Sequence, residues 1–227
     1  MSAAGNKLVL YTARICPYAQ RTAIALHEVG ADYESVEIDL QNKPSWYKDV
    51  NPELKVPALK IQGKNIAESL VLVELISDLY PEKNLTPKDP VQRAQTRFAI
   101  EYFSTKLSPH FYKLVSNNTE EQRKEYKEAT EAAYKRFDEL LREQSPSGPY
   151  FLGDQFSIAD IAIAPFALRI LAVEKTILNG YTSETVKNSP RLSEFLQGIA
   201  NRPSVKETYL GDKELVEALA KRFNLKL

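Results

Sequence analysis

The spacing of apolar residues along this 227-residue chain changes character near residue 80. Before that point, short apolar and β-branched runs alternate with segments whose apolar residues recur every three or four positions. The short runs are typical of strands, and the segments with longer spacing are typical of amphipathic helices. After residue 90 almost every segment has helical spacing. The pattern therefore predicts a mixed α/β part followed by an all-helical part.

The first part has the predicted order β-α-β-α-β-β-α. Gly30 is placed to end the first helix, because glycine readily adopts the left-handed conformation that follows many helices. The predicted strands cover 7–11, 33–39, 57–61 and 66–67, and the predicted helices cover 17–29 and 68–79. The segment 42–51 is expected to hold a short helical turn that starts near Pro44.

The second part is expected to begin after a proline-rich segment, which marks a linker. The helix predicted from Ser157 is apolar around most of its surface, as a buried central helix should be. Ser157 and Asp160 resemble a capping box at its start, with Asp in place of the usual Glu. The predicted helices cover 91–115, 119–144, 157–173, 191–200 and 212–223. The predicted domains are therefore 1–80 and 91–227, joined by a linker at 81–90.

Composition narrows the choice of partners and compartment. The 30 basic and 30 acidic residues balance, so there is no global charge to attract nucleic acid or an anionic membrane. No apolar run reaches the roughly 18 residues of a spanning helix, and the N-terminus has no recognisable secretion signal. The single cysteine suits a reducing compartment, so a cytoplasmic protein is expected. His27 and His110 are far apart in sequence, and no metal is expected.

Cys16 is the residue with the clearest chemical potential. It follows a predicted strand and precedes Pro17, which is favoured at the first position of a helix. The unpaired N–H groups and the dipole at a helix start stabilise a thiolate. Arg14 and Arg21 add positive charge nearby in sequence. We therefore expect Cys16 to be a reactive nucleophile with a pKa below about 8.5, although a small buried apolar cysteine is the alternative.

The position that would hold a second cysteine in a dithiol oxidoreductase is Ala19. Because the chain has no other cysteine, a disulfide formed at Cys16 can be released only by an external thiol. The expected chemistry is monothiol, and glutathione is the natural partner.

Two further motifs have both a structural and a functional interpretation. The Val56–Pro57 bond is trans in the simpler interpretation, whereas a cis bond would turn the Val56 backbone towards Cys16 and offer it to a peptide. Glu68 and Ser69 suit the start of a helix, but they could also capture the carboxylate and ammonium groups of a ligand.

Together these motifs resemble the glutathione transferase family. The resemblance rests on Cys-Pro-Tyr-Ala-Gln-Arg at 16–21, Asn-Lys-Pro-Ser-Trp-Tyr-Lys at 42–48, Asn-Pro at 51–52, Lys-Val-Pro-Ala-Leu at 55–59 and Ala-Glu-Ser-Leu at 67–70. The cysteine motif is similar to the omega class, with the plant lambda class next. The N-terminus is shorter than in animal omega enzymes.

The resemblance implies a thioredoxin-like N-terminal domain, an all-α C-terminal domain and a homodimer. It implies that Cys16 is the catalytic nucleophile, and that the activities are thiol transfer, deglutathionylation and dehydroascorbate reduction. Glutathione would be the co-substrate, with small electrophilic, disulfide or glutathionylated second substrates. The glutathione-binding residues implied are Tyr18, Lys43, Val56, cis Pro57, Glu68 and Ser69. Candidates by position for a second-substrate pocket, each of which also fits the core, are Tyr102, Phe103, Phe111, Tyr112, Phe166 and Arg169.

Other functions remain open from sequence. The chain could be a ligand-binding protein that sequesters apolar or phenolic compounds between its domains. It could also be an interaction protein that kept the fold and lost the chemistry, but the intact motifs argue against this. In a tyrosine- or serine-type conjugating enzyme, Tyr11 or Thr12 would replace Cys16, which is better placed at a helix start.

Overall fold

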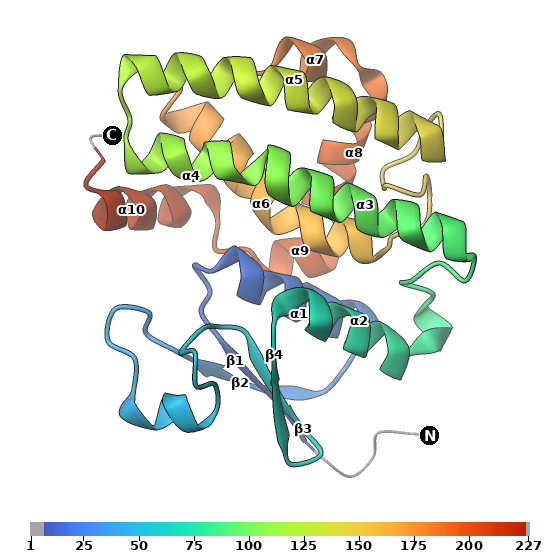
Figure 1. The fold of residues 1–227 in the computed structure, drawn as a ribbon, viewed down its shortest axis with the longest axis vertical. Coiled ribbons are helices and arrows are strands. Elements are labelled where there is room, and N and C mark those ends of the chain that lie inside the picture. Colours follow the sequence, from blue (N-terminus) through green and yellow to red (C-terminus); the bar gives the residue numbers. More distant parts are fainter. Residues whose placement is uncertain (1–6, 226–227) are drawn as a thin grey trace.

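The N-terminal domain is built on a four-stranded mixed sheet. The computed structural model describes residues 7–225. The strand order is β2-β1-β3-β4, with β1 and β2 parallel and the other neighbours antiparallel. The helices α1 (Pro17–Val29) and α2 (Ser69–Leu79) lie between the sheet and the C-terminal domain (Figure 1). The strands are β1 (Leu8–Thr12), β2 (Tyr33–Glu37), β3 (Ala58–Ile61) and β4 (Lys64–Ala67).

The first helix forms as the sequence predicts. Pro17 occupies its first turn, where the missing N–H costs nothing, and Gly30 ends it with a φ of 69°. Ile24 and Leu26 are fully buried on it. The short helical turn predicted near Pro44 is the 3₁₀-helix η1 (Ser45–Asp49), whose N-cap is Pro44. The predicted α/β order is therefore confirmed.

The C-terminal domain is helical and surrounds one central helix, α6. This helix contacts α1 and α2 of the N-terminal domain as well as α3, α8, α9 and α10. All but a few of its side chains are buried, as predicted from its apolar surface. The helices are α3 (Pro90–Lys106), α4 (Ser108–Ser116), α5 (Glu120–Gln144), α6 (Ile158–Thr176), α7 (Glu184–Asn188), α8 (Pro190–Asn201), α9 (Pro203–Thr208) and α10 (Asp212–Phe223).

The prediction of a single helix over 91–115 was wrong. The structure has two helices there, α3 and α4, which meet at Leu107. Pro109 is the physical reason. A continuous helix would need its N–H to bond the carbonyl of Thr105, and the proline ring would clash with that carbonyl. The short helices α7 and α9 were also missed. The proline-rich segment before α3 contains the short 3₁₀-helix η2 (Pro81–Lys83), and the exact domain boundaries stay a prediction.

The predicted capping box at the start of α6 is confirmed. The carboxylate of Asp160 accepts hydrogen bonds from the backbone N–H of Ser157 and of Phe151, both at 2.7 Å. It therefore joins the loop before α6 to the helix itself. Burial raises the pKa of Asp160 to about 6, because its effect is larger than that of these hydrogen bonds, which lower the pKa.

A second buried carboxylate, Glu174, lies near the other end of α6. Its side chain is 3% exposed, and it accepts a hydrogen bond from the hydroxyl of Tyr126 at 2.9 Å. Within residues 7–225 it makes no ion pair. Burial raises the pKa of Glu174 to about 7, because the charged form loses its hydration. The C-terminal core therefore contains a carboxylate that costs stability when it ionises.

We predict that Glu174→Gln stabilises the protein more at pH 8 than at pH 5. Folded Glu174 keeps its proton up to a pH of about 7, whereas a glutamate in the unfolded chain ionises near 4.5. Wild-type stability therefore falls as the pH rises between these two values, by an amount on the order of 3 kcal/mol. Glutamine cannot ionise and escapes this loss.

Urea unfolding of both proteins at pH 5 and pH 8 measures the difference. Glu128→Gln, at an exposed position of α5, is the matched control and should show no such pH dependence. A difference in unfolding free energy between wild type and Glu174→Gln that is equal at both pH values would contradict the prediction.

Candidate active site

Cys16 occupies the N-cap of α1, after the short loop of residues 13–15 that follows β1. Its N–H donates to the carbonyl of Ala13 at 2.8 Å, which closes a turn, and its own carbonyl accepts from the N–H of Gln20 at 3.1 Å. The thiol is half-buried. The predicted placement of the cysteine at the start of a helix is therefore confirmed.

The loop before β3 brings Val56 to this thiol. The Sγ atom of Cys16 lies 4.0 Å from the carbonyl oxygen of Val56, and the predicted cis bond between Val56 and Pro57 is present. Two side chains fix the segment just before it, since the Tyr47 hydroxyl and the Asn51 amide both donate to the Lys55 carbonyl at 2.8 Å. Both residues belong to motifs noted in the sequence, at 42–48 and 51–52, but their hydrogen bonds to the Lys55 carbonyl were not predicted.

The Glu68–Ser69 pair stands at the start of α2. Glu68 has a φ of 73° and an exposed side chain. Such a left-handed conformation is uncommon for a residue with a side chain and is often found at functional sites. Ser69 is 6% exposed, and its hydroxyl accepts a hydrogen bond from Arg21 Nη1 at 3.4 Å. This contact ties the start of α2 to α1, the helix that begins at Cys16.

The other two residues of the expected glutathione site are more exposed. Tyr18, the second residue of α1, is 43% exposed, and its ring meets Phe166 of α6 edge-on with 5.0 Å between the ring centroids. Lys43 is exposed in the segment between β2 and η1. Both side chains are therefore accessible to a ligand.

The expected lowering of the Cys16 pKa is not found. Burial raises the pKa of the thiol above its ordinary value. The N–H groups of Ala19 and Tyr18 and the charges of Arg169 and Arg222 act in the opposite direction but do not outweigh it. Among the described residues, no N–H makes a capping hydrogen bond to Sγ. The sequence located the helix start but did not indicate that the thiol is partly buried.

Two arginines near Cys16 are buried, which sequence reasoning did not predict. Arg21 is 3% exposed, donates to the Ala162 carbonyl of α6 at 2.8 Å, and places its guanidinium 4.6 Å from the centre of the Phe166 ring. Arg169 of α6 is 2% exposed and donates to the Ile15 carbonyl, next to Cys16. The helical spacing that puts Arg21 on the buried side of α1 was the sequence signal from which its burial could have been predicted.

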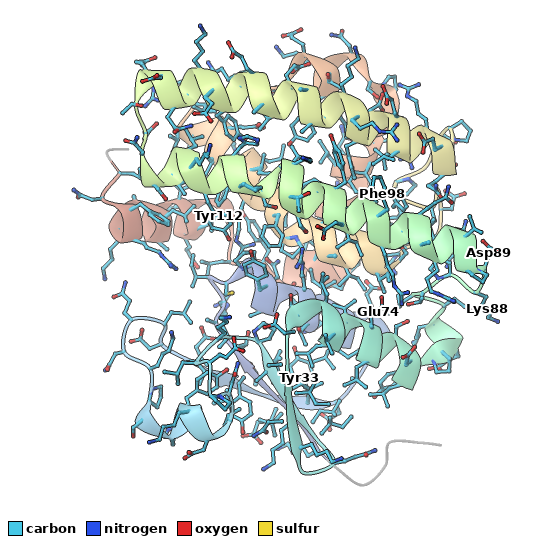
Figure 2. All side chains as sticks on the ribbon, in the orientation of Figure 1. Tyr33, Glu74, Lys88, Asp89, Phe98 and Tyr112 are labelled. Carbon is cyan, nitrogen blue, oxygen red and sulfur yellow. The ribbon has the colours of Figure 1, made fainter. Side chains whose placement is uncertain are left out.

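The structure brings together only some of the second-substrate candidates. Phe166 packs on Tyr18, and Arg169 reaches the loop of Cys16. Tyr112 of α4 (Figure 2) is close enough for the charges of Tyr18 and Cys16 to raise its pKa, after the larger effect of burial.

The remaining candidates lie elsewhere. Phe111 is buried and stacks edge-on against Tyr112 at 5.1 Å. Phe103 is 1% exposed and packs against Phe137 in the core, so it has no surface to offer a substrate. Tyr102 donates to the Ala133 carbonyl of α5 at 3.4 Å, away from this group.

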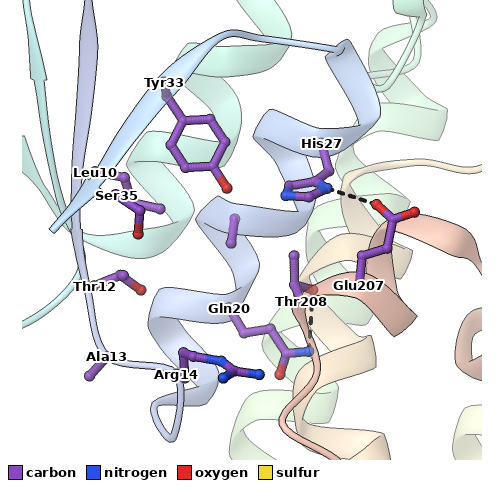
Figure 3. Close-up of a pocket in the computed structure, with 11 residues that line it drawn as sticks. Leu10, Thr12, Ala13, Arg14, Gln20, His27, Tyr33, Ser35, Glu207 and Thr208 are labelled. Carbon is purple, nitrogen blue, oxygen red and sulfur yellow. Dashed lines mark hydrogen bonds and ion pairs between the residues drawn. The ribbon is translucent and has the colours of Figure 1, made fainter. Parts of the chain in front are cut away.

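A cavity of about 210 Å³ lies between β1, β2, α1 and α9 (Figure 3). The Nδ1 atom of His27 lies 3.1 Å from a carboxylate oxygen of Glu207 at its edge, and Tyr33 points towards them. None of the expected glutathione-binding residues lines it. The cavity is therefore separate from the candidate site at Cys16.

Residues 7–225 include no helix with the length and apolar character of a membrane span. No group of three or more His, Cys, Asp or Glu side chains in the same range is arranged to hold a metal ion.

Comparisons with known proteins agree with the geometry. Residues 10–84 match the family model for the glutathione S-transferase N-terminal domain, and residues 98–208 match that for the C-terminal domain. Glutathione S-transferase L3 of Arabidopsis thaliana is 34% identical, over 94% of this chain and 87% of that protein. Glutathione S-transferase omega-1 of Sus scrofa is 29% identical, over 91% of this chain and 82% of that protein.

Solved structures agree as well. Glutathione transferase Omega 2C of Trametes versicolor is 35% identical, with a TM-score of 0.77, over 97% of this chain and 100% of that chain. Omega 2S of the same fungus, solved in complex with 2,4-dihydroxybenzophenone, is 29% identical, with a TM-score of 0.76, over 96% of this chain and 100% of that chain. The chain therefore belongs to the glutathione S-transferase family of enzymes, as a member similar to the omega class.

Proposed function

We propose that this enzyme catalyses glutathione-dependent thiol transfer through a mixed disulfide at Cys16, including deglutathionylation and dehydroascorbate reduction. The observation that carries the proposal is the position of the only cysteine. It lies at the start of α1, and its sulfur is 4.0 Å from the Val56 carbonyl. A monothiol in that position can exchange with glutathione and with no other thiol of the chain.

With a glutathionylated substrate, the reaction takes two steps of thiol–disulfide exchange. The Cys16 thiolate attacks the glutathione sulfur of the substrate disulfide, the substrate thiolate leaves and takes up a proton, and Cys16 is left joined to glutathione. A second glutathione thiolate then attacks the glutathione sulfur of that disulfide. This releases oxidised glutathione and restores the Cys16 thiolate. In sum, the substrate disulfide and one free glutathione become a free substrate thiol and one oxidised glutathione, half of which comes from the substrate, so atoms and electrons balance.

Glutathione would bind across the starts of α1 and α2. The Val56 backbone, turned by cis Pro57, would pair with the cysteinyl backbone of glutathione. Glu68 and Ser69 would hold the γ-glutamyl end, since one offers a carboxylate and the other a hydroxyl at a helix start. Lys43 would meet the glycyl carboxylate, and Tyr18 would lie alongside. Small electrophiles, disulfides or glutathionylated molecules would approach past Tyr112 and Phe166.

A ligand-binding role is the second candidate, and one observation favours it. The Trametes versicolor relative Omega 2S was solved with 2,4-dihydroxybenzophenone. In this chain, Tyr18 is partly exposed beside Phe166 and Tyr112, which would suit a phenolic ligand. Such a compound would compete with the second substrate at the same place. We propose a cytoplasmic location for either role, because the one thiol would need reducing surroundings.

We also propose that the enzyme is a homodimer. Exposed apolar side chains gather on the neighbouring helices α2 and α3, where Val71 is 54% exposed, Val91 66% and Phe98 52%. Between the two helices, Arg97 donates a bidentate pair of hydrogen bonds to the Glu74 carboxylate, both at 2.8 Å. Glu74 and Phe98 lie along this face in Figure 2. A second copy would cover this apolar surface.

Cys16→Ser is expected to reduce thiol transfer to the background rate while the fold and glutathione binding remain. Serine is nearly isosteric and is a good N-cap, but it cannot form a disulfide. The measurements are the reduction of a glutathionylated peptide, calorimetric titration with glutathione, and the mass of the protein after treatment with oxidised glutathione. The wild type should gain one glutathione at Cys16. Wild-type thiol transfer in Cys16→Ser would refute the mechanism.

Ser69→Ala is expected to weaken glutathione binding by roughly 1.5–3 kcal/mol, the cost of one hydrogen bond to a charged group. Calorimetric titration measures this directly. Ser77→Ala is the matched control, since Ser77 is also buried on α2 but its hydroxyl pairs with Thr86. Equal affinity of the Ser69→Ala variant and the control would remove Ser69 from the site.

Phe98→Asp is expected to convert the dimer into monomers, because a charge would be buried in the apolar contact. Sedimentation velocity at micromolar concentration distinguishes the two states. Trp46→Ser changes an exposed aromatic residue on η1, outside the proposed contact, and should leave the dimer intact. A monomeric wild-type protein would contradict the proposal.

A further inference from the structure

Arg169 makes hydrogen bonds that link α6 to the loop carrying Cys16. Its Nη1 donates to the Gln20 side-chain oxygen at 2.6 Å and to the Pro165 carbonyl at 2.7 Å. Its Nη2 donates to the Ile15 carbonyl at 3.0 Å. The planar guanidinium therefore holds its own helix, α1 and the residue before Cys16 in one fixed arrangement.

Gln20 extends this arrangement to α9. Its side chain is 3% exposed, and its amide nitrogen lies 3.5 Å from the hydroxyl of Thr208 (Figure 3). Its backbone N–H donates to the Cys16 carbonyl at 3.1 Å. One glutamine therefore contacts the catalytic turn through its backbone and Arg169 through its side chain.

The charge of Arg169 is unusual for its surroundings. The side chain is 2% exposed, and within residues 7–225 it has no carboxylate partner. Its Nε atom is buried with no hydrogen-bond partner in that range. Burial lowers the pKa of Arg169 to about 10, which reflects the cost of keeping this charge out of water. A fold that only needed packing here could use an apolar side chain.

We propose that Arg169 and Gln20 are positioning residues: Gln20 holds the Arg169 guanidinium, which holds the Ile15 carbonyl and thereby aims the Cys16 sulfur at the Val56 backbone. The proposal rests on the proposed function for its catalytic consequence. The Ile15–Cys16 peptide cannot rotate freely while its carbonyl is bound, so the thiol keeps one direction as it exchanges between substrate and glutathione. Neither residue touches the sulfur in this arrangement.

Arg169 also acts on Cys16 through its charge. Its charge lowers the pKa of the Cys16 thiol, against the larger effect of burial. The other charged or titratable groups that influence or are influenced by this thiol come from four further elements: Arg21 on α1, Tyr47 on η1, Tyr112 on α4 and Arg222 on α10. Arg222 is exposed and screened by solvent, whereas Arg169 is buried.

The test compares Arg169→Met, Arg169→Lys and Gln20→Met with the matched control Arg191→Met. Arg191 is equally buried and donates to the backbone carbonyls of Ser145, Gly148 and Tyr150, all within the C-terminal domain. Four quantities are measured on the full chain. They are the thermal midpoint, the pH dependence of Cys16 alkylation by iodoacetamide, and the kcat and the KM for a glutathionylated peptide.

Arg169→Met is expected to move the alkylation inflection to higher pH and to lower kcat by about tenfold or more, with little change in KM. Arg169→Lys keeps the charge, so it should retain the inflection but still lower kcat. Gln20→Met should also lower kcat. Arg191→Met should lower the thermal midpoint while the inflection and kcat stay at the wild-type values.

The proposal is overturned if Arg169→Lys and Gln20→Met both keep the wild-type kcat. These two variants still test the positioning role if Arg169→Met fails to fold. It is overturned equally if Arg169→Met folds and keeps the wild-type inflection and kcat. If the wild-type protein shows no thiol transfer, the proposed function fails. Unchanged alkylation rates in Arg169→Lys and Gln20→Met would then overturn the positioning role, and lowered rates would support it.

Discussion

The contact between α1 and α6 is the interaction on which the rest of the molecule depends. Each helix carries one buried arginine that donates a hydrogen bond to the backbone of the other domain. Arg21 of α1 donates to the Ala162 carbonyl of α6, and Arg169 of α6 donates to the Ile15 carbonyl just before α1. Because the thiol stands at the start of α1, the relation between the two domains and the position of Cys16 are set by the same contact.

Local signals in the sequence were enough for much of the fold. Pro17 and Gly30 delimit the first helix, and Ser157 with Asp160 starts the central one, because capping acts within a few residues. Pro109 was an equally local signal for the break at Leu107 and was overlooked. The burial of Arg21 and Arg169 depends on residues 140 or more positions away, which no local pattern reveals. The Cys16 pKa was misjudged for the same reason, since burial is a property of the folded chain.

Buried ionisable groups in this protein divide into two kinds according to their partners. Asp160 accepts several hydrogen bonds and thereby joins a loop to a helix, so its burial contributes to specifying the fold. Glu174 has a single partner within the described residues, the Tyr126 hydroxyl. The difference shows why burial alone does not reveal the role of a charged side chain. The number and direction of its hydrogen bonds must be known as well.

The partners of Arg169 on the backbone have an evolutionary consequence. A carbonyl oxygen is present at every position of a chain, so a mutation of Ile15 cannot remove the acceptor that Arg169 uses there. Selection on this contact therefore falls on one member of the pair, and the two positions need not change together. Methods that infer contacts from co-varying positions would miss this link between the domains, although it lies next to the only thiol of the chain.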